Sequence, residues 1–460
     1  MPVHLDILMY CDIFLHSSNT FLMKEAALRE TIYKSVLAFA TTDGINASGK
    51  EEIYGCIFGR DSFITILKLL KVYTNPAAKN LIDVGPIRQM CQTALITLME
   101  LQGKETNLES GEEPGKFIHE YRKDKHERLT KREIRPWYLY PDNIMKNYDS
   151  IDATPLGLIA LYKYWETTGD NAFLLKALPS VEAGLNWIVT YGDRDKDQLL
   201  EYELPKKRKH GGLVVQSWTD SKESMTQVDG TFPLYPIAPV EAQGYAWLAL
   251  KLWADFYGDI EHNYAKTENF AHKLHGFADQ MKKHFNELFL FESEGCTFPV
   301  QALDGDKNQL QTVTGNPLLL LWAGYSKNGK FESVVNEEYI PDLVKRSFMP
   351  DMFDKDAGLR TMSTKSPTHN PGRNSYHNGS FWPKLNGMAH EGLVNWVYIE
   401  EARMLEAATI KPIAFFGEPI ELYVKGENAE KYLLYKNAKG REGCRQQAWS
   451  AAVALDLLMQ

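Results

Sequence analysis

The segment Ile87–Leu101, IRQMCQTALITLMEL, contains the pattern that decides the fold. Its apolar residues stand at positions 87, 90, 91, 94, 95, 98 and 101, which form one face of a helix with about 3.6 residues per turn. Two other segments, Gly244–Trp253 and Ala448–Met459, are apolar nearly all round, as in helices enclosed by neighbours. The two patterns predict two layers, with amphipathic helices outside and apolar helices inside.

Helical periodicity recurs along the chain in about a dozen segments. They lie near residues 21–40, 62–73, 87–102, 154–168, 172–191, 240–257, 262–288, 315–324, 335–347, 381–395, 397–408 and 445–459. Alternation of inner and outer helices predicts an all-α fold, an (α/α)6 barrel of six helical hairpins that spans residues 1–460 as one domain. We expect the long connections to converge on one rim, with short β-hairpins in some of them. These connections cover residues 102–152, 191–239, 351–380 and 410–444.

Composition indicates a soluble protein with a neutral ligand. The 460 residues include 60 acidic and 51 basic side chains, a net charge of -9, which disfavours nucleic acid as a partner. The first 15 residues lack a secretory signal, and no apolar run approaches the ~18 residues of a membrane span. We therefore expect a cytoplasmic protein without a membrane partner, either a monomer or a small homo-oligomer. Five cysteines without CxxC spacing predict no disulfide framework and no zinc site. They are Cys11, Cys56, Cys91, Cys296 and Cys444.

Residues 375–383, SYHNGSFWP, crowd aromatic and polar side chains around Gly379. Flat rings beside fixed hydrogen-bonding groups make a surface suited to sugars, whose axial hydrogens pack on rings while their hydroxyls need partners. The alternative is a buried loop whose polar groups satisfy one another. The candidate sugar contacts in this stretch are Tyr376, His377, Asn378 and Trp382.

Acidic residues stand at the starts of several predicted helices. Asp61, beside Arg60, and Asp152 each precede or begin an apolar helix, where capping alone accounts for a carboxylate. Trp218 stands two residues before Asp220. An aromatic neighbour excludes water and raises the pKa of a carboxyl group, which is the condition for a general acid.

Two further polar clusters are less specific. His119, Glu120 and Arg122 fall within four residues and can bond either sugar hydroxyls or one another. Asp193–Asp197 has the spacing of a calcium loop, but later positions of that loop do not match, so we interpret it as an acidic turn. No metal and no cofactor are predicted.

Several motifs occur here in the order seen in bacterial amylo-α-1,6-glucosidase-like proteins of the glycogen-debranching type, and the chain resembles that family over about residues 55 to 455. The resemblance implies an (α/α)6 barrel and an inverting mechanism with two carboxylates, as in glucoamylases, neutral invertases and glucosyl- or mannosylglycerate hydrolases. The motifs are Gly59-Arg-Asp-Ser-Phe, Glu113-Pro-Gly-Lys, His119-Glu-Tyr-Arg, Tyr148-Asp-Ser-Ile-Asp-Ala-Thr-Pro-Leu, Val240-Glu-Ala-Gln-Gly-Tyr, Gly358-Leu-Arg-Thr-Met-Ser and Ser375-Tyr-His-Asn-Gly-Ser.

The resemblance also implies the two catalytic residues. Asp220, in Ser-Trp-Thr-Asp-Ser, matches the general acid. Glu421, in Glu-Pro-Ile-Glu-Leu-Tyr before the last inner helix, matches the general base, although Glu418 lies within one helical turn and stays open as the alternative. The eukaryotic debranching pattern has a Glu where this chain has Ser380, so the base is not expected there.

The family pattern further implies sugar contacts. Arg60 and Asp61 match a pair that grips hydroxyls of the released sugar, and Arg360 is a second candidate clamp. Glu241 and Gln243 precede an inner helix and can cap it or touch a sugar. The candidate walls, for which core packing is the alternative, are Trp218, Tyr376, His377, Trp382 and Trp449.

These assignments predict an inverting, exo-acting α-glucosidase that acts on glucan ends, branch stubs or a small α-glucoside. Asp220 would protonate the departing oxygen while Glu421 activates water on the opposite face, with the carboxyls roughly 6.5 to 9.5 Å apart. We expect no N-terminal β-sandwich of the kind that larger relatives carry, so an oligosaccharide or glucosyl conjugate is nearly as plausible as glycogen. Lys206–Lys209 would favour an anionic aglycone if it faced the pocket.

Other functions remain open. An (α/α)6 phosphorylase would need phosphate and could dispense with Glu421. The enzyme could instead hydrolyse sucrose or a small glucosyl or mannosyl conjugate. A non-catalytic saccharide-binding module would tolerate Asp220→Asn, and a structural scaffold would show no stabilisation by sugars.

Overall fold

The computed structural model describes residues 24–259, 268–370, 372, 376–425 and 431–460. Outside the described residues lie residues 21–23 and 262–267 of the expected helices, Ser375, Cys11 and the first 15 residues.

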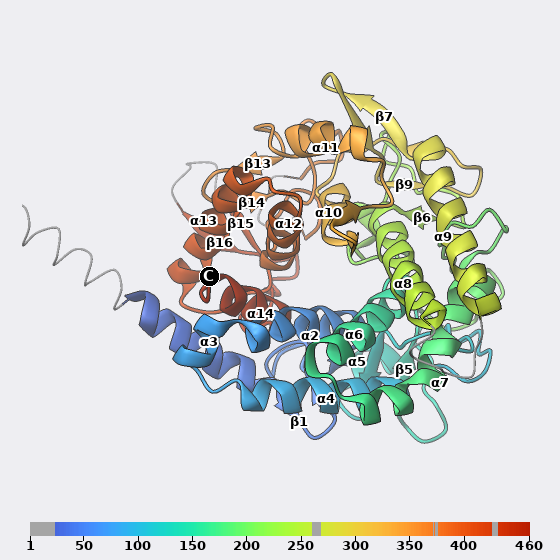
Figure 1. Cartoon of the computed structure of the whole chain (residues 1–460), viewed down its shortest axis with the longest axis horizontal. Coiled ribbons are helices and arrows are strands. Elements are labelled where there is room, and N and C mark those ends of the chain that lie inside the picture. Colours follow the sequence, from blue (N-terminus) through green and yellow to red (C-terminus); the bar gives the residue numbers. More distant parts are fainter. Residues whose placement is uncertain (1–23, 260–267, 371, 373–375, 426–430) are drawn as a thin grey trace, which may run out of the picture.

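An inner ring of helices forms the centre of the molecule (Figure 1). Each helix packs on the next one in chain order, and the last packs on the first, so the ring is closed. Among the described residues the ring has six members. They are α2 (Gly59–Thr74), α6 (Ala153–Thr168), α8 (Val240–Gly258), α10 (Leu319–Trp322), α12 (Pro383–Asn395) and α14 (Ala448–Leu457).

A second layer of helices surrounds this ring (Figure 1). Within the described part of the chain, an outer helix precedes each inner one: residues 24–38, α4 (Gly85–Glu100), α7 (Asn171–Trp187), α9 (Glu268–Leu288), α11 (Ile340–Ser347) and α13 (Ile399–Phe416). Outer helices pack on inner ones, as α7 does on α6 and α9 on α8. The predicted (α/α)6 barrel is therefore confirmed. Short helices α3 (Pro76–Leu81) and α5 (Glu127–Lys131) lie in connections.

The layers follow from the apolar patterns. Sixteen of the 19 residues of α8 and all ten of α14 are buried, against six of the 16 in α4. Close packing inside the ring also depends on a small residue, because a Cβ atom at Gly244 of α8 would lie 2.8 Å from the Leu320 side chain of α10. Burial of both faces keeps α8 and α14 inside, whereas α4 turns a polar face to solvent.

The strands are short and antiparallel, and they belong to the connections. Two three-stranded sheets have the orders β3-β4-β5 and β6-β9-β10. In the first, Phe58 pairs with Glu120 and Glu120 with Asn147, which brings the His119 loop beside the start of α2. The strands are β1 (Ala40–Thr41), β2 (Gly44–Ile45), β3 (Ile57–Phe58), β4 (Glu120–Arg122), β5 (Met145–Asn147), β6 (Ala238–Pro239), β7 (Leu290–Ser293), β8 (Cys296–Pro299), β9 (Ala302–Leu303), β10 (Gln309–Leu310), β11 (Tyr325–Lys327), β12 (Lys330–Glu332), β13 (Phe353–Asp354), β14 (Gly358–Leu359), β15 (Tyr423–Lys425) and β16 (Tyr432–Leu434).

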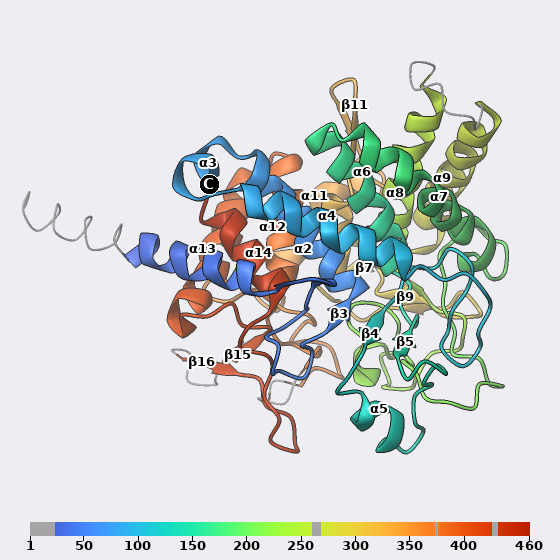
Figure 2. The same ribbon diagram turned by 90° about the horizontal axis from the view of Figure 1, so that it is seen from below.

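Most of these connections lie on one side of the helical layers, as the lower half of Figure 2 shows for β3, β4, β5, β9, β15 and β16. Strand β3 leads directly into α2, and β6 leads directly into α8. The N-terminal ends of these inner helices therefore face the connections. Helix N-termini carry partial positive charge, so this side favours carboxylates.

One described stretch, Asn171–Gly192, is long and apolar enough to cross a membrane by length and composition. It comprises α7 and the π-helical turn Ile188–Gly192. In the barrel, α7 packs on α6 and buries Phe173, Val181 and Leu185. Packing of this outer helix against the inner ring accounts for its apolar face.

Lys68 supplies a test of ring closure. Its buried ammonium donates to Gly387 O at 2.8 Å, to Glu391 at 2.6 Å and to Asp456 at 3.3 Å, so it ties α2 to α12 and α14. We expect Lys68→Met to lower the free energy of unfolding by up to ~3–5 kcal/mol, because it removes the nearer cation of the buried Asp456 and leaves only Lys71, at 3.8 Å. Chemical denaturation measures the loss. The control, Lys34→Met, removes an exposed pair with Glu30 and should cost under ~1 kcal/mol; equal losses would refute the role of Lys68.

Candidate active site

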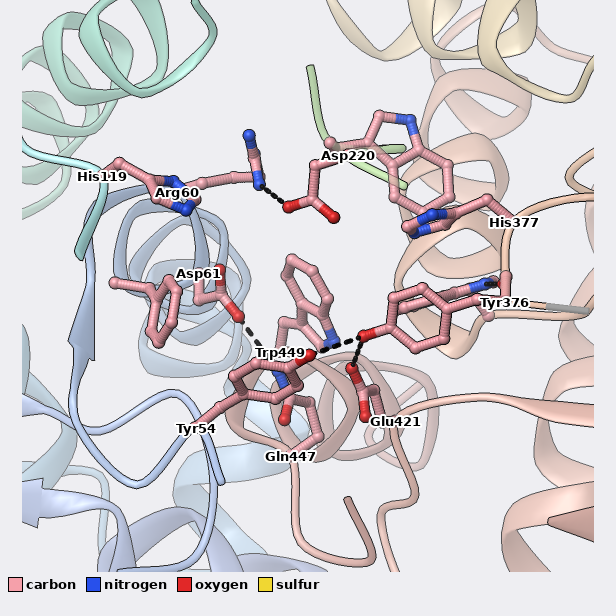
Figure 3. Close-up of a pocket in the computed structure, with 13 residues that line it drawn as sticks. Tyr54, Arg60, Asp61, His119, Asp220, Tyr376, His377, Glu421, Gln447 and Trp449 are labelled. Atoms are coloured by element: carbon pink, nitrogen blue, oxygen red, sulfur yellow. Dashed lines mark hydrogen bonds and ion pairs between the residues drawn. The ribbon is translucent and has the colours of Figure 1, made fainter. Parts of the chain in front are cut away.

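A pocket lies at the N-terminal ends of α2, α12 and α14 and is completed by connecting loops (Figure 3). The space between its walls, including the open mouth, is about 390 Å³. Its lining combines acids, a guanidinium, an amide and many rings: Tyr54, Phe58, Arg60, Asp61, His119, Trp218, Asp220, Tyr376, His377, Trp382, Glu421, Gln447 and Trp449.

Arg60, in the first turn of α2, organises one wall. Its Nε donates to both carboxylate oxygens of Asp152, at 2.9 and 2.8 Å, and its Nη2 donates to Ser217 O at 3.0 Å. Asp152 precedes α6 and is fully buried. The remaining nitrogen, Nη1, lies 3.4 Å from Asp220 Oδ2. Asp152 thus fixes the guanidinium, which in turn reaches the pocket carboxyl.

Asp220 stands on a loop at the edge of the pocket, and its side chain is 28% exposed. Burial raises its pKa to about 6, and the nearby Arg60 charge opposes that rise. The next residue anchors the loop, because the Ser221 N–H donates to His377 Nδ1 at 3.3 Å. The raised pKa makes Asp220 able to carry a proton near neutral pH.

Glu421 stands on the other side of the pocket, just before β15 (Figure 3). It is only 2% exposed. The Tyr376 hydroxyl donates to one carboxylate oxygen at 2.5 Å, and the Cys444 N–H donates to the other at 2.7 Å. Burial raises the pKa of Glu421 to about 7, while these two hydrogen bonds act in the opposite direction. Both carboxylate oxygens are thereby fixed in place.

Asp61 supplies a third carboxyl to the pocket. Gln447, which precedes α14, donates its Nε2 to Asp61 Oδ1 at 2.9 Å. Burial raises the pKa of Asp61 to about 8, and the Arg60 charge opposes the rise. Asp61 can therefore act as a hydrogen-bond donor or acceptor near neutral pH.

Rings form most of the remaining wall. His377 stacks on Trp382 with ring centres 4.9 Å apart, and Trp218 meets Trp382 edge to face at 5.6 Å. Trp449 meets Trp382 at 6.0 Å. The tryptophans therefore pack on one another and also line the cavity, and their contact with a sugar stays a prediction.

Three buried polar atoms of pocket residues have no hydrogen-bond partner within the described part of the chain: His119 Nδ1, Gln447 Oε1 and Trp449 Nε1. Burial and the Arg60, Lys116 and Arg122 charges hold the pKa of His119 well below its usual range, so its imidazole is neutral. Buried polar groups of native proteins nearly always have partners.

Other sequence candidates do not line the pocket, because each is used by the fold. Glu120 and Arg122, which lie on the same face of β4, pair with each other. Gln243 donates to Leu200 O at 2.7 Å, and Asn378 donates to Glu223 O at 2.9 Å. These side chains stabilise the backbone of the surrounding loops.

Arg360, Asp152 and Glu241 also lie behind the walls. The Arg360 guanidinium stacks over Phe381 at 4.7 Å and lies 3.5 Å from Asp354. Asp152 and Glu241 are fully buried at the starts of α6 and α8. The alternative base, Glu418, is absent from the lining and pairs with Arg445 at 3.0 Å.

The basic run and the acidic turn also lie outside the pocket lining. Arg208 of the run Lys206–Lys209 is buried and donates to Asp149 at 2.7 Å, whereas the three lysines of the run are exposed. In the acidic turn, the Lys307 ammonium lies 2.8 Å from Asp195 and 2.6 Å from Asp197. A lysine thus lies among these acids and offsets part of their charge.

Sequence reasoning missed Tyr54, Phe58 and Gln447. Phe58 and Gln447 each stand immediately before an inner helix, as Asp152 and Trp382 do, and this shared position is a signal that could have found them. Tyr54 lies in an irregular loop without periodicity, so no comparable signal exists for it.

No protein-family model matches the chain, and no curated protein matches its sequence. Among solved structures, the fold is similar to a GH63 mannosylglycerate hydrolase from Thermus thermophilus in complex with glucose, with a TM-score of 0.61 and 14% identity over 93% of this chain and 99% of that one. The same hydrolase with Tris and D-glycerate has a TM-score of 0.62 at 13% identity, with the same coverage.

A second similar structure comes from a family of metal-independent α-mannosidases. The Streptococcus pneumoniae protein, in a non-productive complex with α-1,6-mannobiose, has a TM-score of 0.59 and 13% identity over 100% of this chain and 98% of that one. At such low identity the similarity shows the fold, an (α/α)6 barrel. Neither protein is a debranching enzyme by name, so the resemblance to that family stays a prediction.

Tyr376→Phe tests how the pocket sets the Glu421 pKa. Loss of the hydroxyl that donates to Glu421 should raise this pKa from about 7 to about 8 or above, because hydrogen bonds to a charged group are worth ~1.5–3 kcal/mol. Infrared titration of the carboxyl band, with the Glu421→Gln spectrum subtracted, measures the change. The control, Tyr54→Phe, removes a hydroxyl that bonds Tyr376 at 3.4 Å, and a larger effect there would contradict the assignment.

Proposed function

We propose that this protein is an inverting glycoside hydrolase that releases one hexose from the end of an α-glycoside, with Asp220 as general acid and Glu421 as general base. The observation that carries the proposal is the pair of carboxyls with raised pKa values on opposite sides of a ring-lined pocket (Figure 3). Two such groups can protonate a leaving oxygen and activate a water on the opposite face of the sugar.

The surroundings of the carboxyls favour these roles. Asp220 is 28% exposed and Glu421 only 2%, so Asp220 lies where an aglycone can leave and Glu421 lies deeper. The bonds from Tyr376 and Cys444 leave little freedom to the Glu421 carboxylate, which suits a group that must aim one water.

The pocket also suits a sugar ring. Trp382 and Trp449 offer apolar faces, while Arg60 and Asp61 face the same space. A hexose combines an apolar ring face with a hydroxyl on nearly every carbon, and this mixture of rings, guanidinium and carboxyl groups matches both.

Two substrate classes follow from the proposal. The resemblance to debranching-type proteins favours glucose release from an α-1,6-linked or related α-glucoside. The solved Thermus structures favour the second class, a small mannosyl or glucosyl conjugate, because one of them holds glucose and another holds D-glycerate. In both classes the same two carboxyls perform the chemistry.

A substrate panel separates these classes. It should contain maltose, isomaltose, panose, a branched limit dextrin, sucrose, α-1,6-mannobiose, glucosylglycerate and mannosylglycerate, each with and without phosphate. Nuclear magnetic resonance follows the anomer first released. Inverted β-hexose without phosphate supports the hydrolase, whereas release only with phosphate supports a phosphorylase. No turnover together with sugar-induced stabilisation would indicate a binding module.

Substitution of each carboxyl should identify its role. We expect Asp220→Asn to lower kcat/KM by ~10²–10⁴-fold and to recover with an aryl glycoside, whose leaving group needs no proton. We expect Glu421→Ala to lose activity similarly and to recover with azide, which replaces the activated water and gives a β-glycosyl azide. Azide rescue of the Asp220 variant instead would reverse the two roles.

The pH dependence should be bell-shaped, because the productive enzyme carries one proton on the two carboxyls. Activity should fall as pH drops through about 6, where both become protonated, and as pH rises through about 7, where both ionise. Glu421 has the higher pKa of the two. In part of the enzyme that carries a single proton, that proton therefore lies on Glu421, the base, and those molecules are inactive. A profile of kcat/KM from pH 4 to 9 checks this, and a plateau extending above pH 8 would contradict it.

A further inference from the structure

A buried ammonium lies directly behind the pocket wall. Lys384, in the first turn of α12, is fully buried, and its Nζ has no hydrogen-bond partner within the described residues. This atom lies 4.0 Å from the centre of the Trp218 ring and 5.9 Å from that of Trp449. A buried cation without acceptors is costly, and aromatic faces at these distances offset part of the cost.

Trp218 is also held through its indole N–H. Nε1 donates to Asn316 Oδ1 at 3.0 Å, and Asn316 Nδ2 donates to Glu241 Oε2 at 3.2 Å. The Glu241 carboxylate therefore orients the amide, and the amide orients the indole. One tryptophan is held at its face by α12 and at its edge by a connection anchored to α8.

Lys384 and Glu241 also act on each other. Burial lowers the pKa of Lys384 to about 7, and the charges of Asp152 and Glu241 oppose this change. Burial raises the pKa of Glu241 to about 7, and the Lys384 charge opposes that change. Each group therefore helps to keep the other charged, so loss of one weakens the support that the other provides.

The supported tryptophan stands next to the acid. Trp218 is two residues from Asp220, and its ring contacts His377 at 5.7 Å and Trp382 at 5.6 Å. His377 in turn binds Ser221, the residue after the acid. A change in the tilt of the Trp218 ring therefore moves both the wall and the loop that carries Asp220.

We propose that Lys384 is a positioning residue, which with Glu241 and Asn316 holds Trp218 from behind and so fixes the Asp220 loop against the sugar. This inference rests on the proposed function for its effect on catalysis. Its structural part, the hold on Trp218, is independent of any activity.

The experiment labels the protein with 5-fluorotryptophan and identifies the Trp218 fluorine resonance by its loss in Trp218→Phe. We expect Lys384→Met to shift or broaden that resonance and to lower kcat/KM by ~10–100-fold, because a misplacement of about 1 Å at the reacting groups can cost about 10²-fold. Lys384→Arg keeps a cation over the ring and should recover most of both. The matched control is Lys116→Met, which removes another buried lysine, one that lies over the Trp187 ring at 5.6 Å, and should leave the Trp218 resonance unchanged.

A double-mutant cycle then tests whether Lys384 acts through the ring. In a Trp218→Leu background, Lys384→Met should change kcat/KM less than ~3-fold, because its partner is already gone. Should Lys384→Met fail to fold, Asn316→Ser removes the contact to the indole N–H and should perturb the same resonance.

An unchanged Trp218 resonance in Lys384→Met, or an undiminished effect in the Trp218→Leu background, would overturn the proposal. If the resonance moves but no substrate of the panel turns over, the hold on Trp218 stands and the proposed hydrolase fails.

Discussion

Closure of the inner helical ring is the constraint on which the rest of the structure depends. The last inner helix, α14, packs on the first, α2, and Lys68 reaches Asp456 across that contact. Closure brings the end of the chain to its beginning and places Gln447 beside Asp61. The pocket walls come from distant parts of the chain, so the pocket is complete only when the ring is closed.

On the loop side of the ring, charged side chains are buried next to ion-pair or hydrogen-bond partners. Arg60 is held by Asp152 and reaches Asp220, while Glu421 is buried with two hydrogen-bond donors. A buried charge without such partners costs several kcal/mol, so these contacts determine which acids can lie in the pocket at all. The same contacts distinguish Glu421, which is deeply buried, from Asp220, which stays partly exposed and lies near one guanidinium nitrogen of Arg60.

Much of the fold could be predicted, and the candidate site only in part. The helices follow from hydrophobic periodicity, and Asp220 was found because Trp218 stands two residues before it. Residues at the starts of inner helices were also found, but this position places a residue near the site without deciding whether its side chain faces the cavity. Asp61 faces the pocket, whereas Asp152 and Glu241, which also stand at the starts of inner helices, are fully buried and do not line it. Tyr54 gave no signal, because an irregular loop has no period.

By itself, the sequence determined the outer place of α4, the inner place of α8 and α14, and the kinds of side chain gathered in the connections. Hydrophobic periodicity is a local property, and burial of apolar surface turns it into inner and outer helices. Only the tertiary structure decided which acids face one another. Asp220 and Glu421 meet across one pocket because the ring closes and because Phe381 pairs with Tyr423 beside α12. The proximity of these two side chains depends on contacts between distant segments, and no local pattern of residues contains that information.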